Sequence, residues 1–448
     1  MFRNTIKKIS QNSVPVYNRL IMNILKFITA GSVDDGKSTL IGRLLFDSKA
    51  VSHDVLHTLE RQSRNKPDGE LDLSLLTDGL RAEREQGITI DVAYKYFNTL
   101  RRKFIIADAP GHVQYTRNMV TGASNADLAI ILIDARLGVV EQTHRHSLVA
   151  ALMGIPHIVV AVNKMDLVDY DEKTFYDVAA EYQKLAQKLD LKDVKFIPLS
   201  AYIGDNVVEP SKKMGWYEGP TLLHYLETVE VTNVWPAYDA RFQVQYVIRP
   251  RTEELHDYRG YAGALRSGTL KKGDRVRVLP AGIETTLKAI EVHQKEVEEA
   301  YAPQPVVLHL ADDIDLSRGD SLVRIADLQP AVTQDLELDI CWMSERPLQV
   351  GDRYLIRHNA TTVKAIVKEI LYRVNVHSFE HQPTNSLALN DIARIRMRTA
   401  KPIVFDAYRQ NRATGSLIII NENTFDTVAA GMLLEHKREE ELITEFAI

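Results

Sequence analysis

Long apolar runs recur in the first half of the chain and are separated by polar segments. The runs at 26–30, 103–108, 127–135 and 157–164 read KFITA, KFIIAD, DLAIILIDA and HIVVAVNK. Nearly continuous runs are typical of strands covered on both faces, whereas a strand with one wet face alternates polar and apolar residues. A helix is expected over 37–48, directly after the first run and its loop. The pattern predicts a mostly parallel sheet with helices on both faces.

The second half of the chain has a different texture. After VWPAYDA at 234–240, short alternating stretches are interrupted by turns such as those in SGTLKKGD and LSRGD. This spacing is typical of antiparallel barrels or sandwiches, and a break near Gln329 and Pro330 divides the region in two. We therefore expect an α/β domain followed by two antiparallel β-barrel domains. The predicted boundaries are 1–24 for an N-terminal extension, 25–233 for the α/β domain, 234–329 and 330–433 for the barrels, and 434–448 for a charged C-terminal tail.

Composition limits the classes of protein to which the chain can belong. With 448 residues, 45% of them apolar, it can bury a large core in two or three domains. A formal charge of −5 gives no general basic field for nucleic acid. The single cysteine, Cys341, cannot form an intramolecular disulfide or a cysteine cluster for zinc, which favours a reducing cytoplasm.

The first 26 residues carry five basic side chains and no acidic one. The apolar stretch LIMNIL is too short for a signal sequence and is interrupted by Asn23. No run in the chain approaches membrane-spanning length. We expect a cytoplasmic protein with a basic N-terminal extension. The protein is expected to bind neither nucleic acid nor membrane.

The segment GSVDDGKST at 31–39 has the form of a loop that holds phosphate. Gly31 and Gly36 bracket four residues and are followed by Lys37 and Ser38, which matches the pattern GxxxxGK[ST] between a strand and a helix. The glycines let backbone N–H groups converge on the phosphates, the lysine reaches the outer phosphates, and the serine hydroxyl can bind Mg²⁺. The other predicted contacts in this phosphate loop are Ser32, Val33, Asp34, Asp35 and Thr39.

Three further motifs follow in the order that a guanine-nucleotide domain requires. DAPG at 108–111, NKMD at 163–166 and LSA at 199–201 each stand at the end of a predicted strand. Singly, such motifs also occur in ordinary surface loops, but their order after a phosphate loop argues against coincidence. The predicted nucleotide contacts outside the phosphate loop are Asp108, Ala109, Pro110, Gly111, His112, Asn163, Lys164, Asp166, Leu199, Ser200 and Ala201.

Each of these motifs has a chemical reason. Asp108 can hold Mg²⁺ through water, and the Gly111 N–H can sense a γ-phosphate. The Asp166 carboxylate can accept from the two N–H donors of guanine, a pattern that adenine lacks. The Ala201 N–H can donate to the guanine oxygen. These roles predict a domain that binds GTP and GDP together with Mg²⁺.

The segment EREQGITI at 83–90 resembles the first switch of translation-factor GTPases. In these proteins the threonine of the GITI block ligates Mg²⁺ in the GTP state. The resemblance implies that Thr89 joins Ser38 and Asp108 as a metal ligand.

A histidine, His112, directly follows the DAPG motif. The same resemblance implies that it orients the attacking water, while Val33 and Ile88 form the apolar pair that shields this water. The alternative for His112 is an ordinary histidine at a helix N-terminus. The expected catalytic residues are Lys37, Val33, Ile88, Thr89 and His112.

Longer blocks of sequence narrow the family. GSVDDGKSTLIGRLLFDS, TDGLRAEREQGITIDVAYKYF and ADAPGHVQYTRNMVTGASNADLAIILIDAR resemble the large, GTP-binding subunits of bacterial sulfate adenylyltransferases. The resemblance continues through LNDIARIRMRTAKPIVFDAYRQNRATGSLIIIN and covers the chain from about Leu25 to about Met432. Elongation factors usually carry histidine at the position of Asp35. The pair Asp34–Asp35 is therefore typical of the sulfate adenylyltransferase subunits.

The two aspartates of the phosphate loop need an explanation, because the expected ligand is itself strongly negative. Backbone amides face the phosphates in such a loop, so the side chains of Asp34 and Asp35 can point away from them. Asp34 also matches the translation-factor pattern, in which it can help to hold a cation. For Asp35 the sequence offers no role, and a solvated side chain is the alternative.

The resemblance implies a division of labour between two subunits. The chain has one phosphate loop, and the base motif that accompanies it is for guanine. It has no SGGxDS sequence, the glycine-rich loop of the pyrophosphatase type of ATP site. Adenylyl transfer is therefore expected on a small catalytic subunit that binds ATP and sulfate. GTP hydrolysis would drive the formation of adenylyl sulfate and pyrophosphate there, the first step of sulfate assimilation toward cysteine. A fused adenylyl-sulfate kinase is not expected.

An elongation-factor-like translational GTPase is the main alternative, since it shares the switches and the barrels. Against it stand Asp35, the blocks of the second half, and the long region between Ser38 and Thr89, which could engage a protein partner. A third class, a GTPase that acts only as a binding switch, would not need His112.

Overall fold

The computed structural model describes residues 24–51, 54, 57, 71, 73–76, 92–110, 116–231, 238–250 and 258–435. The chain divides into two compact units, Met1–Thr232 and Asn233–Ile448, and each is described by itself. The phosphate loop and the three guanine motifs belong to the first unit. The alternating strands belong to the second.

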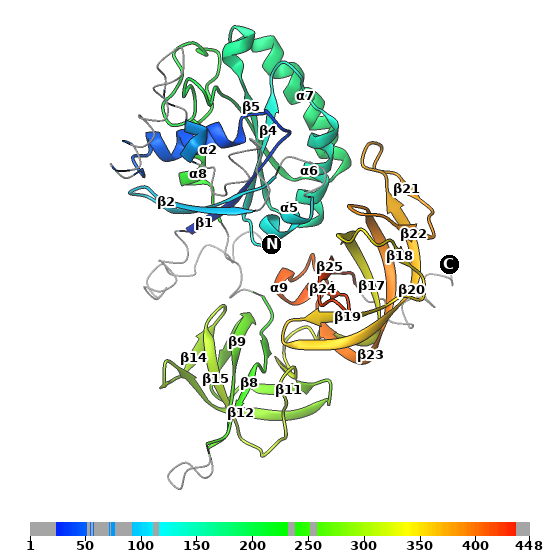
Figure 1. Ribbon diagram of the computed structural model, residues 1–448. Coiled ribbons are helices and arrows are strands. Elements are labelled where there is room, and N and C mark those ends of the chain that lie inside the picture. Colours follow the sequence, from blue (N-terminus) through cyan, green and yellow to red (C-terminus); the bar gives the residue numbers. More distant parts are fainter. Residues whose placement is uncertain are drawn as a thin grey trace, which may run out of the picture. The chain divides into compact units, whose positions relative to one another are not determined.

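A sheet forms the centre of the first unit, and six strands of it lie in the described ranges (Figure 1). The strand order is β2-β3-β1-β4-β5-β6, and all neighbours run parallel except β2 and β3. Each apolar run of the first half forms a strand, and the antiparallel edge strand β2 was not anticipated. The strands are β1 (Ile24–Ala30), β2 (Ala93–Asn98), β3 (Lys103–Asp108), β4 (Leu128–Asp134), β5 (His157–Asn163) and β6 (Asp193–Pro198).

Helices cover both faces of this sheet, with α2 and α8 on one face and α5, α6 and α7 on the other (Figure 1). Parallel neighbours need a crossover connection, and a helix accordingly follows each of the five parallel strands. In the described residues of this unit the helices are α2 (Lys37–Asp47), α5 (Thr116–Ala123), α6 (Glu141–Leu152), α7 (Glu172–Lys188) and α8 (Leu222–Thr228), with the 3-10 helices η2 (Leu73–Leu76) and η4 (Met165–Val168).

The core explains why polar side chains gather at one end of the strands. Strand β4 is buried along its whole length. Its residues Ile130 and Leu132 pack in a cluster with Leu40 and Leu44 of α2. Alternate residues face the opposite side, since side chains of a strand alternate between its two faces. A strand buried in this way can carry polar groups only near its ends, and Asp134 is the last residue of β4.

A closed antiparallel barrel begins the described part of the second unit. Strands β7, β9, β11, β12, β15 and β16 form its ring, and the pairing of β11 with β12 closes it. Phe242, Tyr261 and Leu308 belong to its core. The strands of this region are β7 (Arg241–Gln243), β8 (Tyr246–Ile248), β9 (Gly260–Ser267), β10 (Thr269–Lys271), β11 (Arg275–Leu279), β12 (Ile283–Val292), β13 (Lys295–Val297), β14 (Glu299–Tyr301), β15 (Pro305–Leu310) and β16 (Ser321–Arg324).

A second closed barrel follows, in which β17, β19, β20, β23, β24 and β25 form the ring. The pairing of β19 with β20 closes it. Trp342, Ile356 and Ile395 belong to its core. Its elements are β17 (Ala331–Trp342), β18 (Leu348–Gln349), β19 (Arg353–His358), β20 (Thr361–Val374), β21 (His381–Gln382), β22 (Ser386–Leu387), β23 (Ile392–Phe405), α9 (Arg412–Gly415), β24 (Ser416–Ile420) and β25 (Thr427–Leu433).

The predicted fold class, an α/β domain followed by two antiparallel β-barrels, is confirmed. The boundaries given for the domains stay a prediction. In the part of the chain that the structure describes, no helix is long and apolar enough to cross a membrane.

One face of the β17–β23 pair carries opposite charges at every second position, and we call it the arginine ladder. Its register places each acid of β17 directly opposite an arginine of β23. Side-chain N to O distances across the three pairs are 2.8, 3.2 and 2.8 Å. Opposite charges at facing positions stabilise the register of two strands. The pairs are Asp335 with Arg398, Glu337 with Arg396, and Asp339 with Arg394.

A buried ion pair of the second unit joins Arg241 of β7 to Asp406, the residue after β23. The two residues are 5% and 9% exposed, and Arg241 Nη2 lies 2.9 Å from Asp406 Oδ1. Thr414 Oγ1 donates to Asp406 Oδ2 at 2.6 Å, and Arg241 donates to the Leu328 carbonyl at 2.6 Å. Each ion therefore has further hydrogen bonds, which a buried pair needs to offset its lost hydration.

Candidate functional site

The four predicted motifs meet at the carboxyl edge of the sheet in the first unit. The phosphate loop follows β1, and LSA follows β6. DAPG begins at the last residue of β3, and NKMD begins at the last residue of β5. Because these strands are parallel, their carboxyl ends lie at one edge, where ligands of open α/β sheets bind. The structure thus brings together residues of 31–39, 108–110, 163–166 and 199–201.

The phosphate loop is shaped by a left-handed glycine and a buried lysine. Gly36 has φ 91°, and a Cβ added there would lie 2.5 Å from Asn163 Nδ2, so glycine is required. Lys37 Nζ donates to the carbonyls of Gly31 and Ser32, at 2.7 Å each. These two bonds hold the lysine in the loop. An ammonium has three N–H donors, so among the described residues the third donor of Lys37 is left for a ligand.

The two aspartates of the loop point to different surroundings. Asp34 has φ 68° and is exposed. Asp35 is 3% exposed, and its Oδ2 accepts the Ser32 N–H at 2.5 Å. Burial raises the pKa of Asp35, while the Ser32 N–H and the charge of Lys37 oppose the rise. The alternative of a solvated Asp35 side chain is therefore wrong, since its carboxylate lies inside the loop.

Asn163 joins three segments of the site through one side-chain amide. Its Nδ2 donates to the Asp35 carbonyl at 2.7 Å, and its Oδ1 accepts the Ala201 N–H at 2.9 Å. The side chain is buried. The Ala201 N–H thus has a protein acceptor in this structure, and its contact with a guanine oxygen stays a prediction.

Asp166 has an oxygen that suits a donor from a ligand. Lys164 has φ 62° and turns the chain into η4, whose first turn contains Asp166. Oδ1 of Asp166 is buried and has no hydrogen-bond partner among the described residues. A buried carboxylate oxygen without a donor is costly, so a ligand that supplies N–H groups would be favoured there. The edge of guanine, with two adjacent N–H donors, fits this requirement.

Asp108 lies beside the phosphate loop at the end of β3. It is buried, and Thr29 Oγ1 donates to its Oδ1 at 3.2 Å. Burial lowers the pKa of Lys37, and the carboxylates of Asp108 and Asp35 oppose this change. Ser38, the other predicted metal ligand in the described residues, is in the first turn of α2.

The described residues contain no group of three or more His, Cys, Asp or Glu that could hold a metal ion. A hydroxyl and a single carboxylate, such as Ser38 and Asp108, suit Mg²⁺, which keeps several waters and binds phosphates of the substrate. The residues present therefore fit Mg²⁺ better than a metal that needs a protein cage.

Four predicted site residues, Ile88, Thr89, Gly111 and His112, lie outside the described residues. Their roles as switch, metal and water-orienting groups stay predictions. Val33, the predicted partner of Ile88, is exposed in the phosphate loop.

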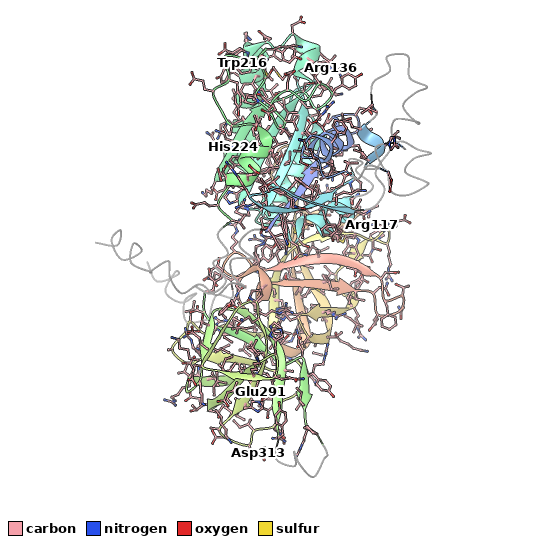
Figure 2. The ribbon with its side chains drawn as sticks, turned by 90° about the vertical axis from the view of Figure 1, so that its left-hand side faces the viewer. Arg117, Arg136, Trp216, His224, Glu291 and Asp313 are labelled. Carbon is pink, nitrogen blue, oxygen red and sulfur yellow. The ribbon has the colours of Figure 1, made fainter. Side chains whose placement is uncertain are left out.

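Asp134 is a residue of this edge that motif analysis missed. It is 2% exposed and accepts from Arg136 Nε at 3.0 Å, Arg136 Nη2 at 2.6 Å and Lys164 Nζ at 2.9 Å. Burial acts to raise the pKa of Asp134, but the hydrogen bonds from Arg136 and Lys164 hold it well below its usual range. Figure 2 shows Arg136 at the surface of the first unit. Asp134 thereby fixes the lysine of the NKMD motif.

Arg43 of α2 was also missed. Its Nε donates to the Ala201 carbonyl at 3.2 Å, and its Nη2 donates to the Tyr202 carbonyl. Asp47, one turn further along α2, lies 3.6 Å from its Nη1. Arg43 therefore ties the helix that follows the phosphate loop to the LSA segment.

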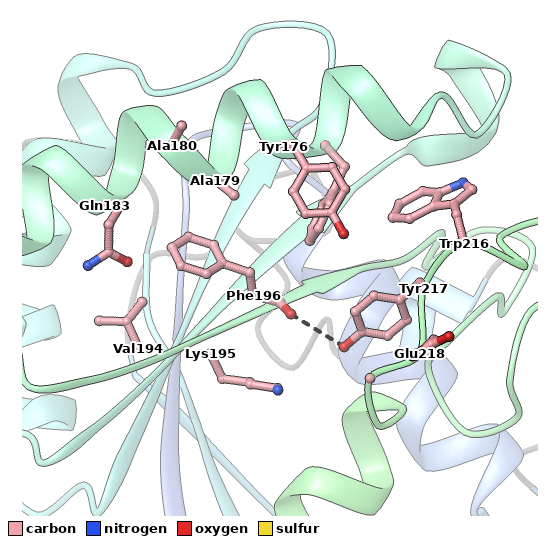
Figure 3. A pocket seen from close by; sticks show the side chains of 12 residues that line it. Tyr176, Ala179, Ala180, Gln183, Val194, Lys195, Phe196, Trp216, Tyr217 and Glu218 are labelled. Carbon is pink, nitrogen blue, oxygen red and sulfur yellow. Dashed lines mark hydrogen bonds between the residues drawn. The ribbon is translucent and has the colours of Figure 1, made fainter.

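An aromatic hollow of about 770 Å³ lies beside α7 and β6 in the first unit (Figure 3). None of the predicted site residues lines it. Tyr217 Oη donates to the Phe196 carbonyl at 3.3 Å and closes part of its wall. The hollow is therefore separate from the four motifs. Its aromatic lining consists of Phe175, Tyr176, Phe196, Trp216 and Tyr217.

Two known protein families match separate parts of the chain. Residues 22–243 match the family described as "Elongation factor Tu GTP binding domain". Residues 335–434 match the family described as "GTP-eEF1A C-terminal domain-like". The first match contains all four motifs of the carboxyl edge.

Curated relatives match nearly the whole chain. "Sulfate adenylyltransferase subunit 1" of Bacteroides fragilis is 49% identical over 422 residues, which cover 94% of this chain and 88% of the relative. "Bifunctional enzyme CysN/CysC" of Mycobacterium tuberculosis is 51% identical over 413 residues, which cover 92% of this chain and 67% of that protein.

A solved structure shows the same fold. The S. cerevisiae Ski7 GTPase-like domain, bound to GTP, superposes with a TM-score of 0.52 and 17% sequence identity. The match covers 95% of this chain and 100% of that chain. At this identity the likeness supports the fold alone.

Proposed function

The chain belongs to the sulfate adenylyltransferase subunit 1 family of elongation factor Tu-like GTPases, and we propose that its GTP hydrolysis drives formation of adenylyl sulfate on a partner subunit. Relatives near 50% identity confirm the family resemblance that the sequence predicted. The observation that carries the guanine assignment is the buried Asp166 Oδ1, for which the described residues supply no donor.

Nucleotide binding follows from the groups on the carboxyl edge. The N-terminus of α2 and the Lys37 ammonium attract the phosphates, since both present N–H donors and positive charge. The Asp166 carboxylate accepts from the guanine N–H donors. Lys164, held by Asp134 at 2.9 Å, is fixed beside this acceptor. Gly36, in its left-handed conformation and without a Cβ, lets the Asn163 amide pack against the phosphate loop.

Mg²⁺ is part of the proposal. When bound, it supplies neutralisation of the negative charge that develops on the phosphates during phosphoryl transfer. Ser38, Thr89 and Asp108 are the residues assigned to hold it. The positions of Ser38 on α2 and Asp108 on β3, at the same edge of the sheet, support two of these assignments.

His112 is proposed to orient the attacking water, and Val33 with Ile88 to shield it. A group that positions a water acts mainly in the transition state, so His112→Ala should lower kcat and leave GTP affinity close to wild type. Single-turnover hydrolysis, measured with the partner present, is the readout. Turnover within about twofold of wild type, less than 1 kcal/mol of barrier, would remove this role.

A small catalytic subunit that binds ATP and sulfate is the proposed partner. The relatives' name, subunit 1, implies that such chains work with another subunit. In this proposal the partner transfers the adenylyl group and this chain supplies the drive, in the reducing cytoplasm that the single Cys341 favours. Nucleic acid and membrane have no part in it.

The test follows adenylyl sulfate to its plateau in a mixture of this chain, the small subunit, ATP and sulfate. Formation of the phosphate–sulfate anhydride from ATP is uphill, so coupled GTP hydrolysis should raise the plateau, not only the rate of approach. A non-hydrolysable GTP analogue and Thr89→Ala should both lose the increase. The same plateau with GTP, with the analogue and without guanine nucleotide would overturn the proposed function.

A further inference from the structure

Asp35 is a charged group of the nucleotide site to which the proposed function gives no role. We propose that its buried carboxylate limits how tightly and how long the site holds a guanine nucleotide, so that GDP leaves quickly. This inference rests on the proposed function, because it concerns release from the same phosphate site.

The structure holds Asp35 in place through one bond to its side chain and one to its backbone. Its Oδ2 accepts the Ser32 N–H at 2.5 Å, and its own carbonyl accepts from Asn163 Nδ2 at 2.7 Å. A Cβ added to Gly31 would lie 3.1 Å from the same Oδ2, which shows how closely the loop surrounds it. With its backbone and its side chain both bonded, Asp35 cannot easily turn its charge toward solvent when phosphates arrive.

The charges near the loop make this position unfavourable for an anion. Lys37 interacts with the carboxylates of Asp108, Asp35 and Asp34. Lys164, another nearby cation, is already paired with Asp134 at 2.9 Å. A phosphate group held by Lys37 is therefore repelled by the same carboxylates. For Asp35 the repulsion is only weakly screened, because the group is 3% exposed, whereas Asp34 faces solvent.

Asp35 thus has two opposed effects on the site. As an acceptor for Ser32 it braces the loop, and as a negative charge it repels the nucleotide. The two effects can be separated, because an amide keeps the acceptor oxygen and removes the charge, whereas alanine removes both.

The experiment measures release of a fluorescent GDP derivative from the full chain with Mg²⁺ and excess unlabelled GDP. Asp35→Asn should slow GDP release about tenfold and raise the affinities for GDP and GTP to a similar degree. This is the size of effect expected for one weakly screened charge. Asp35→Ala, which leaves the Ser32 N–H without its acceptor, should release GDP faster than Asp35→Asn does. Asp35→His carries the residue usual in elongation factors at this position, and it should also slow release.

Two matched variants control for charge alone. Asp335→Asn removes the same charge from the exposed arginine ladder and should leave release unchanged. Asp34→Asn removes a charge one residue away but in solvent, and its effect should be less than about threefold because water and salt screen it. Equal effects of Asp34→Asn and Asp35→Asn would overturn the argument from burial.

Unchanged or faster GDP release in both Asp35→Asn and Asp35→His would overturn the inference while leaving the proposed function intact. If the wild-type chain bound no guanine nucleotide, the proposed function would fail, and this inference with it. Slower release in both variants, with wild-type release in Asp335→Asn, would support the inference.

Discussion

Two charged regions of the molecule, the carboxyl edge of the first unit's sheet and the arginine ladder of the second unit, use their charges in different ways. In the ladder each acid of β17 has an arginine directly opposite on β23. At the carboxyl edge, Oδ1 of Asp166 is buried with no hydrogen-bond partner in the described ranges. Asp35, another carboxylate of this edge, is buried inside the phosphate loop and accepts the Ser32 N–H.

The difference shows what each arrangement can do. Facing charges satisfy each other and specify how two strands align, so little is left for a ligand. A buried acceptor without a donor destabilises the protein without ligand. This loss of free energy is recovered when a ligand supplies the donor, so it favours binding. Substitutions in the two regions should therefore separate effects on binding from effects on folding.

The largest expected effect is that of Asp166→Asn at the carboxyl edge. Hydrogen bonds to a charged acceptor contribute about 1.5 to 3 kcal/mol each, so losing two of them should weaken GTP at least about 100-fold. Preference should shift toward xanthosine nucleotides, and the free energy of unfolding should not fall. Titrations with GDP and xanthosine diphosphate measure the shift. Unchanged GTP affinity would contradict the guanine assignment and would show that the buried Asp166 oxygen is not a ligand acceptor.

Asp406→Ala should produce the opposite result, a loss of stability without a loss of binding. Removing one partner of a buried ion pair costs about 3 to 5 kcal/mol, because Arg241 would stay buried with the more distant, partly exposed Asp239, 3.9 Å away, as a counter-ion. Urea unfolding of the second unit measures the cost, with Asp335→Ala on the exposed ladder as the matched control. A cost no larger than that of the control would show that the pair is not buried in solution.

Asp134→Asn should show an intermediate effect that depends on pH. The folded-state pKa of Asp134 is depressed by Arg136 and Lys164, so its ionised form stabilises the fold. This contribution, about 1.5 to 3 kcal/mol for a hydrogen bond to a charged group, is present above the unfolded pKa near 4 and is lost as pH falls toward the folded pKa. Unfolding of the first unit between pH 7 and pH 2 measures it. Parallel pH profiles for wild type and variant would contradict the pairing.

The smallest effect is expected for Arg396→Ala in the ladder. Its guanidinium lies 3.2 Å from Glu337 and 3.0 Å from Glu369, and the side chain is 53% exposed. Exposed ion pairs contribute about 0 to 1 kcal/mol and are screened by salt. Thermal unfolding at low and high ionic strength should show a small difference that shrinks with salt. A loss above about 2 kcal/mol would mean that the ladder behaves like a buried network.

Much of the fold could be predicted because its signals are local. The run KFIIAD forms β3 (Lys103–Asp108) with the predicted bounds, and the helix expected over 37–48 is α2 (Lys37–Asp47). Continuous apolar runs of this kind are typical of strands covered on both faces, and four of the six residues of β3 are buried. Strand β2, with the sequence AYKYFN, was not anticipated because it contains no continuous apolar run. Its exposed residues alternate with half-buried ones and the buried Phe97, and β3 is its described neighbour in the sheet.

The site was predicted where a motif has fixed spacing and missed where contacts join distant segments. The phosphate loop is contiguous, but Arg43 and Ala201 are 158 residues apart and meet only in the folded chain. Asp134 had no signal beyond being an acid at the end of an apolar run. The inward position of Asp35 depends on the left-handed Asp34 before it, which propensities of single residues do not reveal.

The amide of Asn163 has a consequence for how the site opens. One rigid group bonds the phosphate loop through the Asp35 carbonyl and the LSA segment through the Ala201 N–H. Neither segment can then separate from β5 without breaking a bond on the same side chain. In hydrogen exchange the amides of the phosphate loop and of the LSA segment should therefore lose protection together, as one cooperative unit that is tied to the end of β5.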